Sequence, residues 1–425
     1  MSSKVSRHRR VDPERGNPAT APTFTGTLAT GVHVVGGMGN ALSIETEVGI
    51  VQIDTGPSDR QARKMQSRLR ELSDAPIHAI VYSHGHLGYN NAVESWLSHA
   101  SERSEPLPRI IAHENLERRW ARYRETEGPQ QYFIELQFRL ARGAMQDPLS
   151  LHLPTETFRD AIRLGGAGRE VQILWAPSET DDAIIAWLPQ EKLLYGGAAI
   201  TPSIPNVGTP LRSLRDPIRW ADTLDRLADL DPEIVVMEFG PPLEGTAKIQ
   251  EILRGTSAAL RWLRREVVLR LNRGMGAQEI LEDLDYPSEL FSVAWMYPLY
   301  GMADYIVRDI VRAETGWWDR NPTNLHPARL AEAGAAIRSA ISDPAAVIAR
   351  GRELAAEGDY QLALHVVDLL ALAEVDDPFV LEARSLKSEL CEKCADGAES
   401  FVSKSLYLSS ARILAQHPAK PTGIR

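Results

Sequence analysis

Short runs of β-branched and aromatic residues, separated by glycine, dominate the first part of the chain. Between residues 23 and 86 this pattern, typical of strands, occurs in GVHVVGG, ALSIETEVGIVQIDTG and IHAIVYSHGH. Residues 60–72 lie between the last two segments and carry apolar positions at helical spacing. The pattern therefore predicts a strand, a helix and a second strand that leads into SHGH.

Strands return between residues 157 and 244, in REVQILWAP, DAIIAWLPQEKLLYGG and EIVVMEFGPP. A helical pattern, DPIRWADTLDRLADL, separates the last two of these runs. The two strand regions are linked by a strand, RIIAHEN, and by a helical stretch over residues 117–143. This alternation of strands and helices predicts an α/β fold.

The strand pattern ends at Gly245, and amphipathic helical segments make up the rest of the chain. With 425 residues, two domains are the natural expectation. We expect an α/β domain over residues 24–245, an all-helical domain over 246–425, and a disordered tail over 1–23. Residues 349–390 have the pattern of one helical hairpin with a Gly-Asp turn, whose apolar face favours a homodimer.

The composition is that of a globular protein, with 43% hydrophobic and 24% charged residues. A net charge of -10 argues against nucleic acid as a partner. No apolar run is long enough to span a membrane, and the basic N-terminus lacks the apolar segment of a secretory signal. We therefore expect a cytoplasmic protein.

Both cysteines, Cys391 and Cys394, form a CxxC motif, which can be a redox pair or half of a metal site. The motif lies in a charged, helix-like stretch with no second cysteine pair and no preceding strand. This context argues against a redox function.

The candidate chemistry begins at the end of the apolar strand IVYSHGH. His84 and His86 are separated by one residue at this strand exit, so both imidazoles can project toward one metal ion, and imidazole suits zinc.

The order of several motifs resembles the alkyl sulfatase branch of the metallo-β-lactamase superfamily. The motifs are IDTG, VYSHGH, SETDDAIIAWLPQEKLLYGG, NVGTPLRSLRDP, GWWDRNP and SLYLSSARIL, and the likeness runs from about residue 24 to about residue 414. The resemblance implies an αββα metallo-β-lactamase sandwich followed by an all-α dimerisation domain. It also implies that Glu179 replaces a third histidine as metal ligand, and that Asp54 orients the histidines.

The chain departs from this family at the second metal. The family motif is His-x-His-x-Asp-His, whereas this chain has Gly88 and Tyr89 at the last two positions. The bridging acidic residue would fall near Ala198, and a late histidine near Phe239. The ligands of one metal survive, so we expect one zinc ion, or another divalent metal, on His84, His86 and Glu179. Glu238 is a candidate for an additional oxygen ligand.

The resemblance also points to residues that would contact the substrate. Asn206 and Arg212 fall where the family binds sulfate, with Arg215 as a competitor and a surface salt bridge as the ordinary alternative for Arg212. His113 is a candidate for acid–base work or a capping histidine. Tyr89 could hydrogen-bond a substrate oxygen or fill the volume of the lost histidine.

Together these expectations describe a metal-dependent hydrolase that uses water on a single metal to cleave a sulfate ester or a related small anionic substrate, with an alkyl chain as one option. The alternative is a catalytically inactive dimeric binding protein that keeps the pocket. Trp317 and Trp318 are expected to pack the helical half, or else to line an apolar channel for an alkyl chain.

Overall fold

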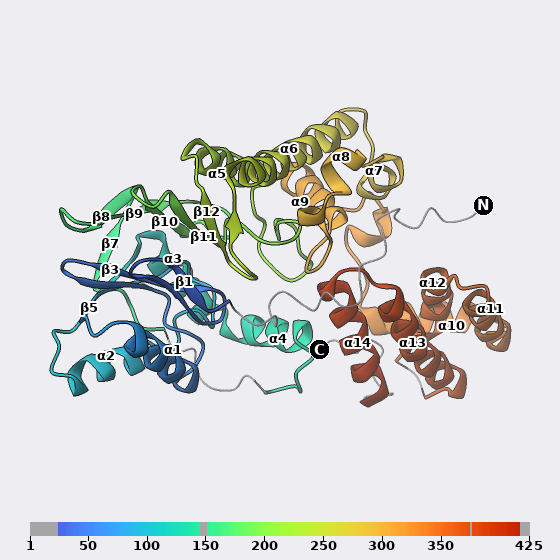
Figure 1. Cartoon of the computed structure of the whole chain (residues 1–425). Helices are drawn as coiled ribbons and strands as arrows, with labels where there is room; N and C mark the ends of the chain where they lie inside the picture. The colour runs from blue at the N-terminus through green and yellow to red at the C-terminus, as the bar shows by residue number, and fades with distance from the viewer. Residues whose placement is uncertain (1–23, 145–150, 375, 417–425) are drawn as a thin grey trace. The chain divides into compact units, whose positions relative to one another are not determined.

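The computed structural model describes residues 24–144, 151–374 and 376–416 (Figure 1). Contacts between Cα atoms divide the chain into two compact units. The first unit comprises Met1–Glu127 and Asp147–Ala313, and the second comprises Gly128–Gln146 and Glu314–Arg425. The expected tail over 1–23 lies outside the described residues.

Within the described residues, the first unit is built around two β-sheets. The seven-stranded sheet has its strands in chain order: β1 (Gly26–Ala29), β2 (Val32–Gly36), β3 (Ala41–Thr46), β4 (Gly49–Ile53), β5 (Ile77–Val81), β6 (Arg109–His113) and β7 (Glu156–Phe158). The six-stranded sheet has the order β13 (Leu243–Glu244), β12 (Ile234–Met237), β11 (Leu193–Gly197), β10 (Ile184–Leu188), β9 (Glu170–Trp175) and β8 (Ala161–Gly165). Strands β4 to β7 are parallel neighbours, as are β11 and β12.

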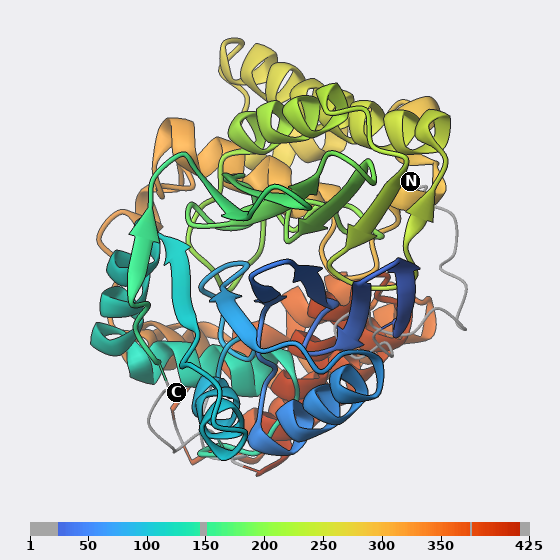
Figure 2. The same ribbon diagram turned by 60° about the vertical axis from the view of Figure 1, so that its left-hand side comes forward.

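Helices cover the outer faces of both sheets, as Figure 2 shows. The outer face of the first sheet packs on α1 (Asp59–Leu72), α2 (Val93–Glu102) and α3 (Asn115–Glu125). The second sheet packs on α5 (Pro217–Asp229) and α6 (Thr246–Leu271). This helix–sheet–sheet–helix order confirms the predicted αββα sandwich, and most of the helical second unit follows it in the chain.

The period-two alternation of the strands produces the layers. In β5, Ala79 and Val81 face the core between the sheets, whereas Ile80 and Tyr82 face the helices. Burial on both faces is why this strand is a continuous apolar run, as is usual for parallel strands between two covered layers. Burial of a large aliphatic side chain such as Ile80 or Val81 contributes about 1.5–3 kcal/mol from its removal from water.

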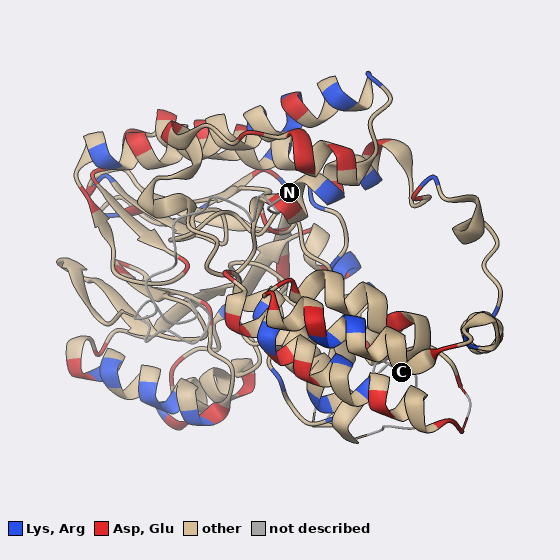
Figure 3. Ribbon diagram, turned by 90° about the vertical axis from the view of Figure 1, so that its right-hand side faces the viewer, with Lys and Arg blue, Asp and Glu red and all other residues tan. Residues whose placement is uncertain are grey.

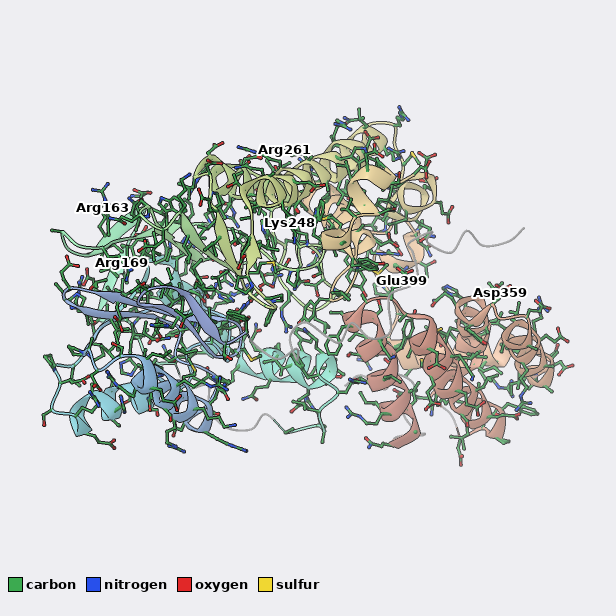
Figure 4. All side chains as sticks on the ribbon, viewed as in Figure 1. Arg163, Arg169, Lys248, Arg261, Asp359 and Glu399 are labelled. Carbon is green, nitrogen blue, oxygen red and sulfur yellow. The ribbon has the colours of Figure 1, made fainter. Side chains whose placement is uncertain are left out.

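Charged side chains hold the rims of the sandwich. Arg169, labelled in Figure 4, pairs with Glu191 at 2.8 Å and donates at 2.7 Å to the backbone oxygens of Thr30 and Glu45. It thereby ties the second sheet to the first. Lys/Arg and Asp/Glu are interspersed on the outer helices (Figure 3). Arg261 of α6 forms ion pairs with Asp222 and Asp225 of α5.

The first unit extends beyond the compositional boundary at Gly245. It also contains α7 (Ala277–Asp283), α8 (Ser288–Phe291), the 3-10 helix η2 (Ala294–Met296) and most of α9 (Ala303–Thr315). Apolar residues of α6 to α9 share one buried cluster with the second sheet and α5. The end of the strands is therefore a change of composition rather than the limit of the packed unit, so the unit extends past the predicted limit at residue 245.

The second unit is helical. Its elements are α4 (Glu127–Gln137), the 3-10 helix η3 (Pro322–Asn324), α10 (Leu330–Ala340), α11 (Pro344–Ala356), α12 (Tyr360–Ala371), α13 (Pro378–Gly397) and α14 (Phe401–Gln416). Helices α11 and α12 form the predicted hairpin, and Gly358 has the left-handed φ of 87° that its turn requires. Asp343 and Asp377 cap α11 and α13, each followed by proline at the first helical position.

Two expectations for the helical region need correction. The helical stretch predicted over 117–143 is two helices, α3 and α4, interrupted at Thr126. Trp317 and Trp318 do not pack into a core of this chain, because they are 70% and 42% exposed. No helix among the described residues is long and apolar enough to cross a membrane.

Candidate metal centre

The candidate site lies at the strand ends of the first unit. His84 and His86 follow β5, and Glu179 lies in the loop between β9 and β10 of the other sheet. Asp54 follows β4, and Glu238 follows β12. Carboxyl ends of parallel strands share one edge of a sheet, which is where α/β folds commonly place their sites.

The donor atoms of His84, His86 and Glu179 lie within 4.8 Å of one another. The Nε2 atom of His84 is 3.0 Å from Nδ1 of His86, and that Nδ1 is 3.5 Å from Oε2 of Glu179. Two ligands of a tetrahedral zinc ion are about 3.3 Å apart when each bond is about 2.0–2.1 Å long. The two spacings to Nδ1 of His86 are therefore close to those of neighbouring ligands on one ion.

A hydrogen-bond chain connects His84 to Asp54. The Nδ1 atom of His84 is 2.9 Å from the Ser83 hydroxyl, which leaves Nε2 for a metal. Asp54 in turn accepts a 2.9 Å bond from the Ser83 backbone N–H and interacts with the Ser83 side chain. Asp54 thus acts on the histidine through Ser83, a residue that the sequence motifs did not single out. Such outer partners orient metal ligands.

Glu179 is held by two neighbours through its other oxygen. Oε1 accepts hydrogen bonds from Asn206 at 3.1 Å and from Arg215 at 2.9 Å, which leaves Oε2 facing His86. Arg215 also donates to the backbone oxygen of Asn206. The geometry therefore gives both residues a contact with the candidate ligand Glu179, which their sequence position alone did not indicate.

The electrostatic surroundings favour neutral imidazoles. Burial, followed by the neighbouring His86, holds the pKa of His84 well below its usual value. Burial, Arg215 and Arg119 do the same for the pKa of His86. Because a metal binds the unprotonated ring, both histidines are in the form that coordination requires at neutral pH.

Comparisons with known proteins match both parts of the chain. The metallo-beta-lactamase superfamily model matches residues 34–238, and the alkyl sulfatase dimerisation model matches residues 276–417. A linear primary-alkylsulfatase of a Pseudomonas species is 29% identical over 388 residues, covering 87% of this chain and 72% of that protein. The chain therefore carries a metallo-beta-lactamase superfamily domain followed by an alkyl sulfatase dimerisation domain, and it is similar to alkylsulfatases over most of its length.

Two other relatives are less similar in sequence. An (R)-specific secondary-alkylsulfatase of Pseudomonas is 24% identical, covering 88% of this chain and 59% of that protein. The structure of the stereoselective inverting sec-alkylsulfatase Pisa1 from Pseudomonas has a TM-score of 0.79 at 22% identity, covering 92% of this chain and 65% of that one. The chain thus spans about three fifths to three quarters of its relatives' lengths, and the structural likeness shows the shared fold.

In this chain, Tyr89 stands where the family motif has a histidine, and it forms a buried pair with Glu238. The Tyr89 hydroxyl donates a short hydrogen bond to Oε1 of Glu238, and the Tyr89 ring lies 4.3 Å from the His84 ring. Burial, followed by Glu179, raises the pKa of Glu238 well above its usual value. Among the described residues, Glu238 does not join the group of converging ligand atoms. Ala198 is buried and has no donor side chain.

Arg212 lies close to His86 and Glu179. Its Nη1 donates at 3.0 Å to the backbone oxygen of Leu211, and its guanidinium interacts with Tyr300 and Arg215. Burial raises the pKa of Tyr300 to about 12. No sequence motif indicated Tyr300, which comes from the segment before α9 and from the region matched by the dimerisation model.

His113 has a local structural environment. Its Nδ1 accepts from the backbone N–H of Asn115, so the other nitrogen, Nε2, donates to the backbone oxygen of Arg159 at 2.7 Å. Its ring also stacks on Trp175 with centroids 5.3 Å apart. Both nitrogens are engaged by backbone, which matches the capping alternative rather than acid–base work.

The buried carboxyl of Asp54 generates a prediction about pH. Burial raises its pKa to about 6. Between about pH 4 and 6 the unfolded chain ionises this group while the folded chain keeps the proton, so the folded state loses stability as pH rises. Two pKa units correspond to about 3 kcal/mol. Between pH 4 and 7, we expect the free energy of unfolding of Asp54→Asn to rise by about 2–3 kcal/mol relative to that of the wild type.

Urea unfolding of both proteins in chelator, at a series of pH values, measures this difference. A free-energy difference between the two proteins that stays constant across the range would show that Asp54 is ionised when folded.

Proposed function

We propose that this chain is a metal-dependent hydrolase that cleaves a sulfate ester with one zinc ion bound by His84, His86 and Glu179. The observation that carries the proposal is the convergence of two imidazole nitrogens and one carboxylate oxygen from two different sheets. Two histidines and one glutamate are a complete ligand set for a catalytic zinc ion, which keeps a fourth position open. Another divalent metal is compatible with the same ligands.

The metal, when bound, would supply Lewis-acid activation for hydrolysis. The protein's own groups then divide the remaining work. Ser83 and Asp54 hold His84 in one orientation, while Asn206 and Arg215 hold Glu179.

The substrate-contacting roles rest on charge and position. Arg212 is proposed to bind the sulfate group, because a guanidinium offers a planar pair of donors to an oxyanion. Asn206, beside Glu179, and the Tyr89 hydroxyl would contact substrate oxygens at the edge of the site. The substrate class, a small sulfate ester with an alkyl chain, follows the names of the alkylsulfatase relatives.

Release of inorganic sulfate from octyl sulfate tests the proposal. The zinc-reconstituted chain is expected to release sulfate, and His84→Ala is expected to lower kcat/KM by at least about 10³-fold, because a metal contributes several kcal/mol. His152→Ala is a matched control, since His152 lies outside the site and pairs with Glu94. No sulfate release by the zinc-loaded wild type would instead favour an inactive binding protein.

Two arginine variants separate substrate binding from metal binding in the same assay. Arg212→Ala is expected to weaken octyl sulfate binding about 10–100-fold, the scale of a charged hydrogen bond, without loss of zinc. Arg215→Ala removes a partner of Glu179 and is expected to weaken zinc binding about 10–100-fold. Equal and negligible effects of both variants on binding of the sulfate ester would remove the sulfate assignment.

We also propose a homodimer formed through the second unit. The alkyl sulfatase dimerisation model covers most of this unit. Large apolar side chains in its segment 317–330 are exposed in the single chain: Trp317, Trp318, Leu325 and Leu330. Exposed apolar groups of this size are typical of interaction surfaces. The cytoplasmic location expected from the sequence stays a prediction, which cell fractionation can test.

Light scattering at micromolar concentration is expected to give twice the chain mass of 47.1 kDa. The double change Trp317→Ser and Trp318→Ser should shift the protein toward monomer, because it removes apolar area from the interface. Leu107→Ser changes an exposed leucine of the first unit and should leave the mass unchanged. A wild-type chain that is monomeric at this concentration would contradict the dimer.

A further inference from the structure

Helix α3 contacts both loops that carry the candidate ligands. We call residues 82–89 the histidine loop and residues 176–183 the glutamate loop. The two loops follow strands of different sheets, and one backbone hydrogen bond, from the Ile184 N–H to the Ser83 oxygen at 2.9 Å, joins the histidine loop to the residue after the glutamate loop. Within the first unit, the side chains of α3 provide a further connection between the two loops.

Arg119 of α3 joins the helix to the glutamate loop. Its Nε donates to Oδ1 of Asp182 at 2.6 Å, and its Nη2 donates to Oδ1 of Asp181. The arginine side chain is only 13% exposed, and the Asp182 side chain is fully buried. A single planar guanidinium thus spans two consecutive carboxylates, two and three residues after Glu179.

Helix α3 also contacts the histidine loop at Gly85. Trp120 donates from Nε1 to the Gly85 backbone oxygen at 3.0 Å. A Cβ atom on Gly85 would lie 2.7 Å from Cδ of Arg119 and 2.9 Å from Oδ2 of Asp182. The residue between the two histidines is therefore packed directly against the arginine–aspartate pair, with no room for a side chain.

Asp182 depends strongly on this arginine. Its Oδ2 has no hydrogen-bond partner among the described residues, and its Oδ1 receives the Arg119 bond. A buried carboxylate that loses its cationic partner is costly, so the loop would rearrange rather than keep Asp182 in place without Arg119. Any such rearrangement moves the backbone beside Glu179 and the packing surface of Gly85 together.

We propose that Arg119 is a positioning residue that sets the spacing of the metal ligands by coupling the glutamate loop to the histidine loop. The metal part of this inference rests on the proposed function. The charge of Arg119 also lowers the pKa of His86, but its packing contacts are with Asp182 and Gly85, and through these it acts on ligand geometry.

The chain offers a matched control on the same helix. Arg118 also pairs with Asp181, at 2.9 Å, but its side chain is 76% exposed. Arg118→Ala therefore removes one ion pair to the glutamate loop while leaving the contacts of Arg119 with Asp182 and Gly85. Arg119→Lys keeps the positive charge but loses the planar fork that spans both carboxylates.

The experiment compares these two variants with the wild type in the full-length chain. Zinc affinity is measured by competition with a chromophoric chelator, and ligand geometry by the visible spectrum of the cobalt-substituted protein. Hydrogen–deuterium exchange of the metal-free protein reports on the two loops, and urea unfolding reports on overall stability.

Arg119→Lys is expected to weaken zinc binding about 10–100-fold, the usual effect of losing an outer partner of a metal ligand. It should alter the cobalt spectrum and speed exchange in both loops, whereas Arg118→Ala should stay within about twofold of the wild type for zinc. Equal zinc affinities and spectra for both variants would overturn the proposal, as would faster exchange throughout the first unit. If the wild type binds no zinc, the proposed function fails, and the exchange of the two loops alone decides whether Arg119 couples them.

Discussion

The centre of this structure depends on bringing two imidazoles from one sheet next to one carboxylate from the other. His84 and His86 come from the end of β5, and Glu179 comes from the β9–β10 loop. Burial favours the neutral form of both rings, and hydrogen bonds leave Nε2 of His84 and Oε2 of Glu179 directed at the shared point. The apolar core between the two sheets holds them together, and this packing keeps the three side chains close to one another.

The proposed limit of one ion rests on the same buried region. The Tyr89 hydroxyl bonds to Glu238, and burial and Glu179 favour the protonated form of that carboxyl. A neutral acid hydrogen-bonded to a phenol satisfies the polar groups without a cation. Ala198 supplies no ligand atom nearby. We propose that this neutral hydrogen-bonded pair takes the place of a second metal.

The sequence predicted those features that local patterns carry. Alternating apolar residues predicted the strands of the sandwich, and motif order predicted the family and the three converging ligands. The contacts of Arg215 with Glu179, and of Arg119 with Asp182, join segments that are 36 and 63 residues apart, so no local pattern reveals them. The extent of the first unit was missed for the same reason, because α6 to α9 pack on the second sheet through apolar faces that look like those of any amphipathic helix. The prediction that Trp317 packs in a core was wrong, because the sequence pattern around an exposed tryptophan does not differ from that around a buried one.

The most direct test of this account is the number of zinc ions held by each chain, measured by native mass spectrometry of untagged protein dialysed against excess zinc. The account predicts one tightly held ion per chain, lost in His84→Ala, because the described ligands converge on one position. Two tightly held ions per wild-type chain would contradict the assignment of Tyr89 and Glu238 as a metal-free pair. A wild-type chain without zinc would contradict the tripod itself.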